Sequence, residues 1–172
     1  MRTPTSRDRH AFSLIELSIS TVIVGVMMTA SLTVVADGLA SRATLRRGAA
    51  AQAMAEQLLA EITSQAYADA GGSTTLGLEA AVGTRSRVTF DDVDDYALLV
   101  ENPPAERDGT PVAGASAFVR STEVVWVTAA NLRTGSITDT GVKRIAVTVR
   151  HSGKVVASAS AVRTRLYDGV AP

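Results

Sequence analysis

The sequence predicts an α+β protein in which one long N-terminal helix packs on an antiparallel β-sheet. Three observations support this fold. Residues 12–36 are almost uninterruptedly apolar, residues 51–66 repeat apolar side chains at helical spacing, and residues 145–161 alternate apolar and polar side chains around a short turn. Apolar residues recur every three to four positions on a helix face and every second position on a strand face. The chain therefore changes from helix to strands along its length.

The first element is the apolar run at residues 12–36, whose single charged side chain is Glu16. A bilayer core is crossed by about 20 apolar residues in a helix, so this run is long enough to span a membrane. A helix buried in a soluble domain seldom stays apolar on every face. A carboxylate at membrane depth costs about 2.5–3.5 kcal/mol, so we expect Glu16 to have a partner there.

The second element continues the same helix from Asp37 to about Ala70, where Gly71, Gly72 and Ser73 are expected to end it. One face carries the apolar stripe Ala51, Met54, Ala55, Leu58, Ile62 and Ala66. The other side carries Gln52, Glu56, Gln57, Glu61 and Gln65. This amphipathic pattern predicts that the second half of the helix lies against the sheet.

Residues 73–87 are expected to form a loop, and short alternating runs follow at 87–90 and 96–100. A turn-rich connection is expected at 102–111, and two strands at 115–120 and 123–128. The clearest strands form a hairpin. Ile145, Val147 and Val149 face the core on one strand, residues 151–153 turn, and the partner strand presents the apolar set Val155, Ala157, Ala159 and Ala161.

Composition excludes several classes of function. Lys plus Arg and Asp plus Glu balance at 17 each, so net charge indicates neither nucleic acid nor an acidic substrate, and the absence of Cys excludes disulfides and thiolate sites. His151 lies at the expected hairpin tip without a Gly-x-Ser-x-Gly segment to serve it, and no phosphate-binding glycine loop is present. We expect neither an enzyme nor a cofactor.

Four carboxylates crowd into residues 91–95, namely Asp91, Asp92, Asp94 and Asp95. Carboxylate oxygens suit Ca²⁺, but the segment lacks the ordered spacing, the glycine and the distal Glu of an EF-hand loop. We expect a solvated acidic turn, with a calcium site as the weaker alternative. A contact surface for another protein subunit is a third interpretation.

The segment from Arg9 to Leu17, RHAFSLIEL, resembles the class III signal of type IV pilins and type II secretion pseudopilins. In that family a basic leader ends in a small residue, usually Gly, and a membrane peptidase cuts there and methylates the new N-terminal Phe. The resemblance implies cleavage between Ala11 and Phe12, which makes Glu16 the fifth mature residue. It also implies a pilin-like fold. No Pro interrupts the chain between Pro4 and Pro103, which favours a pseudopilin or minor pilin.

The resemblance divides the chain into a leader at 1–11, a membrane-spanning helix half at 12–36, an amphipathic helix half at 37–70 and an outer sheet domain at 71–172. It implies a single-pass inner-membrane protein with a periplasmic C-terminal domain, which later joins a filament. The implied partners are prepilin peptidase, other pilin or pseudopilin subunits, the inner-membrane assembly platform and membrane lipid. No nucleic acid partner is expected.

Glu16 has two interpretations at this point. Its carboxylate pairs with the N-terminal amine of Phe12, in its own or a neighbouring subunit, or it extends to the membrane surface.

The basic leader suits the cytoplasmic side. However, Arg42, Arg46 and Arg47 follow the span on the other side, where they are available to lipid head groups or DNA.

Three functional alternatives remain open. The preferred one is a minor pseudopilin of type II secretion, and a minor type IV pilin ranks close to it. The second is a minor pilin for DNA uptake or adhesion. The third is a secreted binding module, released by ordinary signal peptidase after Val34-Val35-Ala36, so that the mature chain starts at Asp37.

Overall fold

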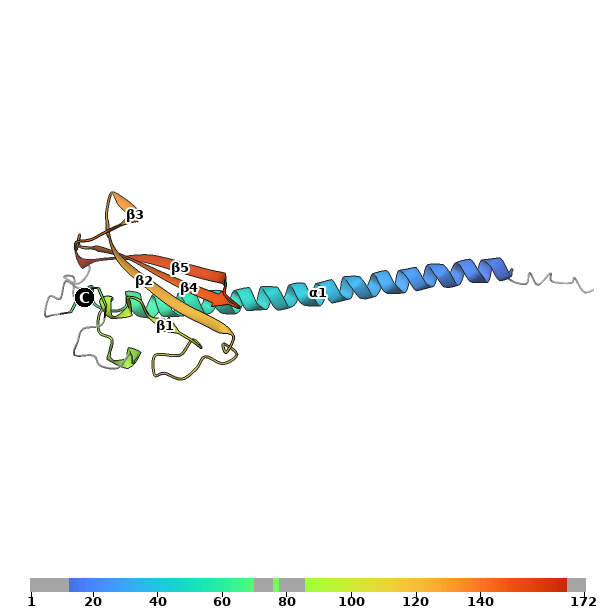
Figure 1. Cartoon of the computed structure of the whole chain (residues 1–172), viewed down its shortest axis with the longest axis horizontal. Coiled ribbons are helices and arrows are strands. Elements are labelled where there is room, and N and C mark those ends of the chain that lie inside the picture. The colour runs from blue at the N-terminus through green and yellow to red at the C-terminus, as the bar shows by residue number, and fades with distance from the viewer. Residues whose placement is uncertain (1–12, 70–75, 78–85, 167–172) are drawn as a thin grey trace, which may run out of the picture. The chain divides into compact units, whose positions relative to one another are not determined.

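The computed structural model describes residues 13–69, 76–77 and 86–166. The chain divides into two compact units, Met1–Leu45 and Arg46–Pro172. One helix, α1 (Leu14–Thr63), is continuous from the first unit into the second (Figure 1). The two units are described in turn.

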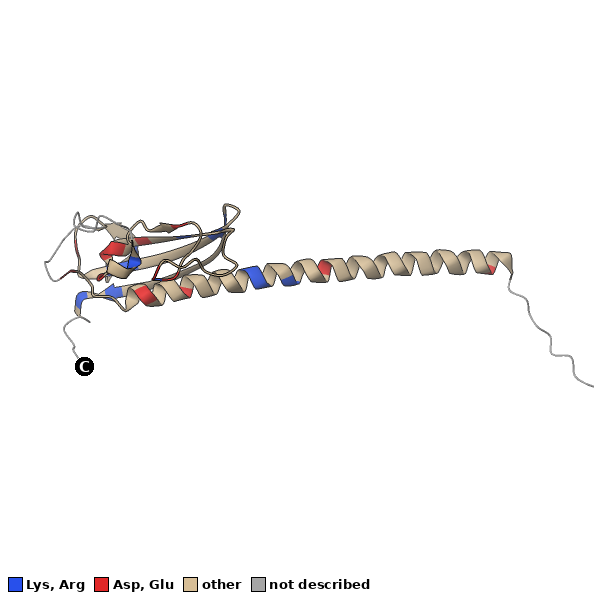
Figure 2. Ribbon diagram, turned by 90° about the horizontal axis from the view of Figure 1, so that it is seen from below, with Lys and Arg blue, Asp and Glu red and all other residues tan. Residues whose placement is uncertain are grey.

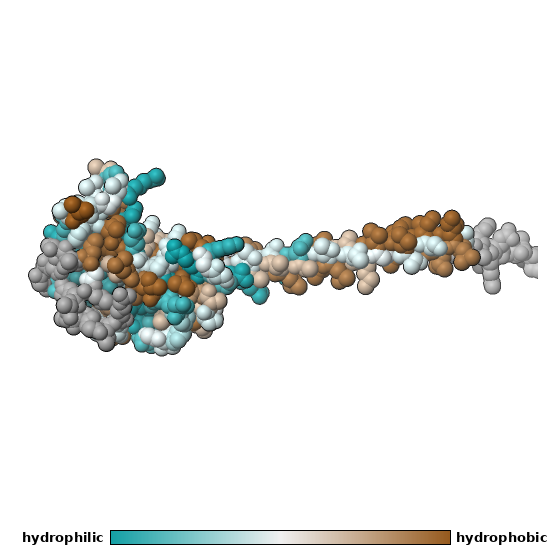
Figure 3. Space-filling model, in the orientation of Figure 1, coloured by the Kyte–Doolittle hydropathy of each residue, from teal (hydrophilic) through white to brown (hydrophobic). Residues whose placement is uncertain are grey.

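The described part of the first unit is a helix with no buried side chains. Its large apolar residues are exposed, including Leu14 at 84% and Val34 at 72%, and Figure 3 shows hydrophobic side chains over much of this stretch. The hydroxyl groups of Ser18, Thr21 and Thr33 donate to carbonyl oxygens four residues earlier, at 2.7–2.8 Å. A helix that satisfies its own polar groups and exposes apolar side chains suits a membrane, and α1 is long and apolar enough to cross one.

The second unit contains a five-stranded antiparallel sheet on which the last part of α1 packs (Figure 1). The strand order is β1-β2-β4-β5, with β3 paired to β2 off this path. The strands are β1 (Val100–Glu101), β2 (Phe118–Thr128), β3 (Asn131–Ser136), β4 (Val142–His151) and β5 (Lys154–Thr164). Two short 3₁₀ turns, η1 (Arg87–Thr89) and η2 (Asp94–Tyr96), precede the sheet. The predicted α+β architecture is confirmed.

The hydrophobic core lies between α1 and the inner face of the sheet. The predicted helix stripe is confirmed at Ala51, Met54, Ala55, Leu58 and Ile62, all of them buried. The sheet contributes Val124, Ile145, Val147, Val149 and Ala157, and the segments before it contribute Phe90, Val93, Tyr96 and Leu99. The sixth residue of the predicted stripe, Ala66, is exposed and lies beyond the end of the helix.

The prediction that the helix continues to Ala70 is wrong, because α1 ends at Thr63. Ser64 N donates to both Ala60 O and Glu61 O, at 3.1 and 3.2 Å, and Gln65 N donates to Ile62 O at 3.1 Å, so the last turn changes to hydrogen bonds between residues three apart. Ala66 then forms a parallel bridge with Asp92, and its carbonyl accepts Val93 N at 3.0 Å. Residues 71–73, the predicted end of the helix, lie outside the described residues.

The predicted hairpin is confirmed as β4 and β5. Ser152 and Gly153 make the tight turn with positive φ angles of 51° and 77°, the geometry that suits a two-residue hairpin loop. Val149 pairs with Ala157 but Arg150 pairs with Val155, so Val156 is an extra residue, a β-bulge. The bulge reverses the side-chain alternation. Val155, predicted to face the core, therefore shares the outer face with Arg150 and is 58% exposed.

Four other runs that were expected to alternate or to form strands differ from the structure. Residues 118–120 of the first run and all of the run at 123–128 belong to one eleven-residue strand, β2, and residues 115–117 precede it. The intervening polar residues do not interrupt it, because the Thr122 hydroxyl faces inward and donates to Tyr96 O. The run at 87–90 contains the 3₁₀ turn η1, and the run at 96–100 contributes only Val100 to a strand. Most of the predicted loop at 73–87 lies outside the described residues.

Candidate functional site

Glu16 occupies the first turn of α1, where a carboxylate is favoured by the positive end of the helix dipole. It is exposed, and its carboxylate has no ion pair within the described residues. It is the one charged side chain between residues 13 and 36, and Figure 2 shows the long uncharged stretch that follows it. Ala11 and Phe12, the predicted cleavage pair, lie outside the described residues. The structure therefore presents Glu16 as a lone carboxylate on an apolar helix.

The acidic cluster at 91–95 is folded into the protein, so the predicted solvated turn is wrong. Asp92, Asp94 and Asp95 are only 4–5% exposed. Asp92 Oδ1 accepts the amides of Asp94 and Asp95 at 2.7 and 3.1 Å, and Asp95 Oδ2 accepts the Asp91 amide at 3.1 Å. No three acidic or histidine side chains within the described residues converge to hold a metal ion, so the geometry gives the calcium alternative no support.

Asp94 is held by Lys143, which projects from the inner face of β4. Lys143 Nζ lies 2.8 Å from each carboxylate oxygen of Asp94 and also donates to Tyr67 O. Both side chains are buried. Burial raises the pKa of Asp94 to about 6, although the ammonium group of Lys143 opposes that shift. This pair joins η2, the segment after α1 and the sheet.

Tyr67 extends the same cluster. Its ring lies 3.9 Å from Lys143 Nζ, and its hydroxyl donates to Asp139 Oδ1 at 2.6 Å. Burial and this hydrogen bond raise the pKa of the Tyr67 phenol. Asp139 also pairs with Arg165, just beyond β5. The chain that leaves α1 is thus fastened to both β4 and the end of β5.

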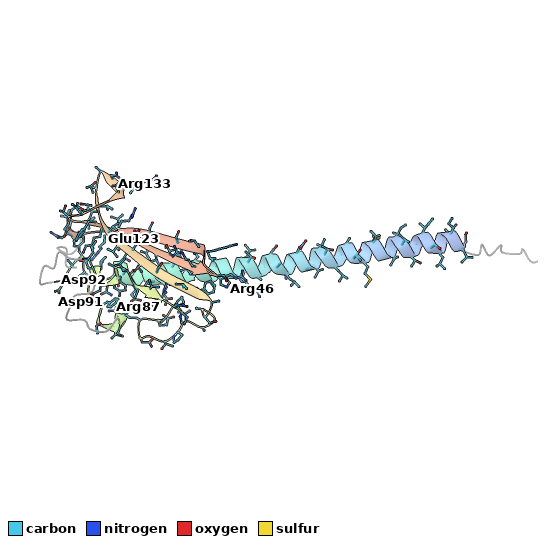
Figure 4. All side chains as sticks on the ribbon, viewed as in Figure 1. Arg46, Arg87, Asp91, Asp92, Glu123 and Arg133 are labelled. Atoms are coloured by element: carbon cyan, nitrogen blue, oxygen red, sulfur yellow. The ribbon has the colours of Figure 1, made fainter. Side chains whose placement is uncertain are left out.

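A second buried cluster fixes the C-terminal part of α1. Arg87, labelled in Figure 4, contacts Glu61 of α1 at 2.5 Å and Glu101 of β1 at 3.0 Å. Arg120 of β2 contacts Glu101 at 2.6 Å. Arg120 also donates to the carbonyls of Met54 and Ala105 at 3.0 and 2.5 Å. Glu61, predicted on the polar side of the helix, is therefore a structural ion-pair partner.

Sequence reasoning missed both clusters. The available signal was the strand alternation itself. Arg120 alternates in phase with Thr122, Val124 and Trp126, and Lys143 alternates in phase with Ile145 and Val147. A cation at an inward position of a strand predicts a buried carboxylate partner, because an unpaired buried charge is strongly destabilising. The partner's position, far away in sequence, was not available from that pattern.

Comparison with known proteins identifies the N-terminal segment. Residues 6–32 match the family model for the prokaryotic N-terminal methylation motif, the hallmark of type IV pilins and pseudopilins. The match includes Ala11, Phe12 and Glu16. No curated protein and no solved structure matches the chain. The matched motif and the observed architecture, a long apolar helix packed on an antiparallel sheet, are both similar to those of type IV pilins and pseudopilins.

Proposed function

We propose that this chain is a minor subunit of a type II secretion pseudopilus or a type IV pilus. Prepilin peptidase cuts it between Ala11 and Phe12 and methylates the new amine of Phe12. The subunit then waits in the inner membrane, with its sheet domain in the periplasm, until the assembly platform adds it to the filament. The observation that carries this proposal is the methylation motif at 6–32, which overlaps the apolar first part of α1, where no described side chain up to residue 36 is buried.

In this proposal, the carboxylate of Glu16 forms the ion pair on which assembly of the subunits depends. Once Phe12 is the N-terminus, its amine comes four residues before Glu16 in the sequence, a spacing that corresponds to about one turn of a helix. The residues next to Glu16 include the exposed apolar side chains of Leu14, Ile15 and Leu17. The carboxylate is then available to the amine of its own chain or of a neighbouring subunit. Burial of either charge alone is costly, so pairing them fixes the register in which apolar helices leave the bilayer and pack together.

The sheet domain contributes a rigid surface. Its internal carboxylates Glu61, Glu101 and Asp94 are paired with arginine or lysine side chains. Such pairs lock the relative positions of α1, the turns and the sheet. A domain of this kind suits a mechanical and recognition role at the filament surface or tip. We rank a pseudopilus subunit first and a minor type IV pilin close to it, with DNA uptake or adhesion, and a secreted binding module, as alternatives.

The Glu16→Ala substitution tests the proposal. The variant should remain in the membrane and be processed at Phe12, because the apolar run and the cleavage site are unchanged. Its amount in sheared filaments should fall at least about tenfold, since removing one member of a buried ion pair costs about 3–5 kcal/mol. Asp37→Ala is the matched control, because it removes the next carboxylate along the same helix and should leave assembly unchanged. Normal filament content in Glu16→Ala would refute the proposed role.

A further inference from the structure

Three arginines lie on α1 shortly beyond its apolar stretch: Arg42, Arg46 and Arg47. All three are exposed, and none forms an ion pair or a side-chain hydrogen bond with any described residue. Figure 2 shows this basic segment of α1 and the long uncharged stretch, with one acidic residue between them, and Figure 4 labels Arg46. These arginines are therefore cations for which the described residues supply no ion-pair partner.

The helix itself cannot neutralise them. Side chains meet on a helix at spacings of three and four residues, and the positions at those spacings hold only Gly, Ala, Leu, Thr and Arg. Arg42 and Arg46 are four residues apart, so they repel one another. The carboxylates of the sheet domain that bind cations are already engaged by others, namely Arg87, Arg120, Lys143, Arg144 and Arg165.

The three arginines lie close enough to the apolar run to reach the lipid head groups at the membrane surface. At about 1.5 Å per residue, Arg42 lies about 9 Å and Arg47 about 16 Å beyond Ala36 along the helix. The polar head-group layer extends about 5–8 Å beyond the hydrocarbon core, and an arginine side chain can extend back toward it. Guanidinium groups bind phosphate oxygens with two parallel hydrogen bonds.

We propose that Arg42, Arg46 and Arg47 bind the phosphate groups of anionic phospholipids on the membrane face next to the sheet domain. This inference rests on the proposed function, because it requires residues 12–36 to span the bilayer. Each basic residue near an anionic surface increases association about fivefold. The contacts hold α1 at one depth in the bilayer, and they break when the subunit leaves for the filament. Release from the membrane therefore depends on its anionic lipid content.

The test uses the full chain in phosphatidylcholine bilayers that contain a trace of spin-labelled lipid. Electron paramagnetic resonance gives the fraction of labelled lipid immobilised at the protein, for phosphatidylglycerol and for phosphatidylcholine. The unaltered chain should prefer phosphatidylglycerol several-fold. The triple variant Arg42→Gln, Arg46→Gln, Arg47→Gln should bring that ratio close to one.

Two control variants separate this site from the rest of the charge. Replacing Arg133, Arg150 and Lys154 with Gln removes three exposed cations from the sheet domain and should leave the lipid preference unchanged. Replacing the leader residues Arg2, Arg7 and Arg9 with Gln measures any contribution from the other end of the span. The phosphatidylglycerol preference that remains in the leader variant should still be lost on adding the Arg42, Arg46 and Arg47 substitutions.

The outcomes are distinguishable once insertion is scored by resistance to carbonate extraction. A chain that is extracted overturns both the proposed function and this inference. A chain that is retained but shows no phosphatidylglycerol preference, or keeps it in the triple variant, overturns the inference alone. Loss of duplex DNA binding in the triple variant, with lipid preference unchanged, would assign the arginines to nucleic acid and also overturn it.

Discussion

Arg120 is fully buried in the sheet domain, yet it carries a charge. Its guanidinium group has three acceptors, which come from β1, α1 and the turn-rich connection: Glu101, Met54 O and Ala105 O. A buried cation is tolerated only when its hydrogen bonds are met, because desolvation of the charge is expensive. The side chain of Arg120 therefore links β1, α1 and the turn-rich connection, and its hydrogen bonds form only when all three segments are in place.

Replacing Arg120 with Met should lower the free energy of unfolding by about 3–5 kcal/mol. Glu101 would keep only Arg87 as a partner, and two buried carbonyls would lose a donor. The measurement is urea unfolding in detergent micelles, followed by the fluorescence of Trp126, the single tryptophan. Arg133→Met on β3, where the side chain is exposed, should stay within about 0.5 kcal/mol. Equal unfolding midpoints for the two variants would contradict the role of Arg120.

Asp94 should make stability depend on pH in a direction opposite to that of most carboxylates. Burial raises its folded-state pKa from about 4 to about 6, with Lys143, Asp92 and Asp139 as its charged neighbours. The folded protein therefore binds the proton more tightly than the unfolded chain does. The resulting stabilisation is complete below pH 4 and is lost as the pH rises through 6.

Asp94→Asn removes this titration. The unfolding free energy of the unaltered chain minus that of Asp94→Asn should fall as the pH rises from about 4 to about 6, because only the unaltered chain loses the stabilisation by the Asp94 proton. Urea unfolding at closely spaced pH values measures it, and comparing differences cancels the titration of groups that the two proteins share. A difference that stays constant, or grows with pH, would show that Asp94 does not titrate in this way.

At the scale of elements, the end of α1 shows what local sequence does not reveal. Residues 66–70 are rich in alanine and favour a continued helix by propensity. Long-range contacts override that preference. Lys143 and Arg163, on β4 and β5, donate to the carbonyls of Tyr67 and Gln65, and Ala66 bridges to Asp92. Those partners lie far away in sequence, so no window around residue 66 contains the signal.

The β4–β5 hairpin was predictable because its information is local. Alternating apolar residues on both strands and the short turn at Ser152 and Gly153 lie within one stretch of chain. The bulge at Val156 was not predictable from that pattern. Alternation gives each strand a face, but it does not say where one extra residue enters the ladder. That single residue accounts for the error at Val155.

The part of α1 in the sheet domain should be stabilised by Gly48→Ala. A Cβ atom at Gly48 would meet nothing within 4 Å, so the change adds no clash. Alanine favours a helix over glycine by about 1 kcal/mol, which should raise the melting temperature by about 3–6 °C. Circular dichroism in detergent micelles measures it. The reverse change at an exposed position of the same helix, Ala53→Gly, should lower the melting temperature by a similar amount. No rise in Gly48→Ala would mean that the helix is not regular there.

At the scale of the whole molecule, the two units differ in what stabilises them. The described helix of Met1–Leu45 exposes its apolar side chains and has one carboxylate in its first turn. The unit Arg46–Pro172 encloses a hydrophobic core and paired buried charges. A membrane provides the environment that the first unit lacks in water. The second unit is stabilised by its own internal contacts.

The candidate site was predictable only where its information is contiguous. The methylation motif lies within 6–32, so the sequence alone predicted it, and the match spans Ala11, Phe12 and Glu16, whose individual roles stay predictions. The acidic cluster was wrongly predicted to be solvated, because Lys143, the lysine that pairs with the buried Asp94, lies 49 positions away in sequence, on β4. Four adjacent carboxylates resemble a solvated turn until that cation is placed beside them.

The most direct test of the proposed function is the mass of the N-terminal peptide of the mature protein from native membranes. Processing by prepilin peptidase predicts a peptide that begins at Phe12 and carries one added methyl group. Such a peptide would make Glu16 the fifth residue of a subunit ready for assembly. A peptide that begins at Asp37 would contradict the proposal, because ordinary signal cleavage would discard Glu16 together with the apolar helix.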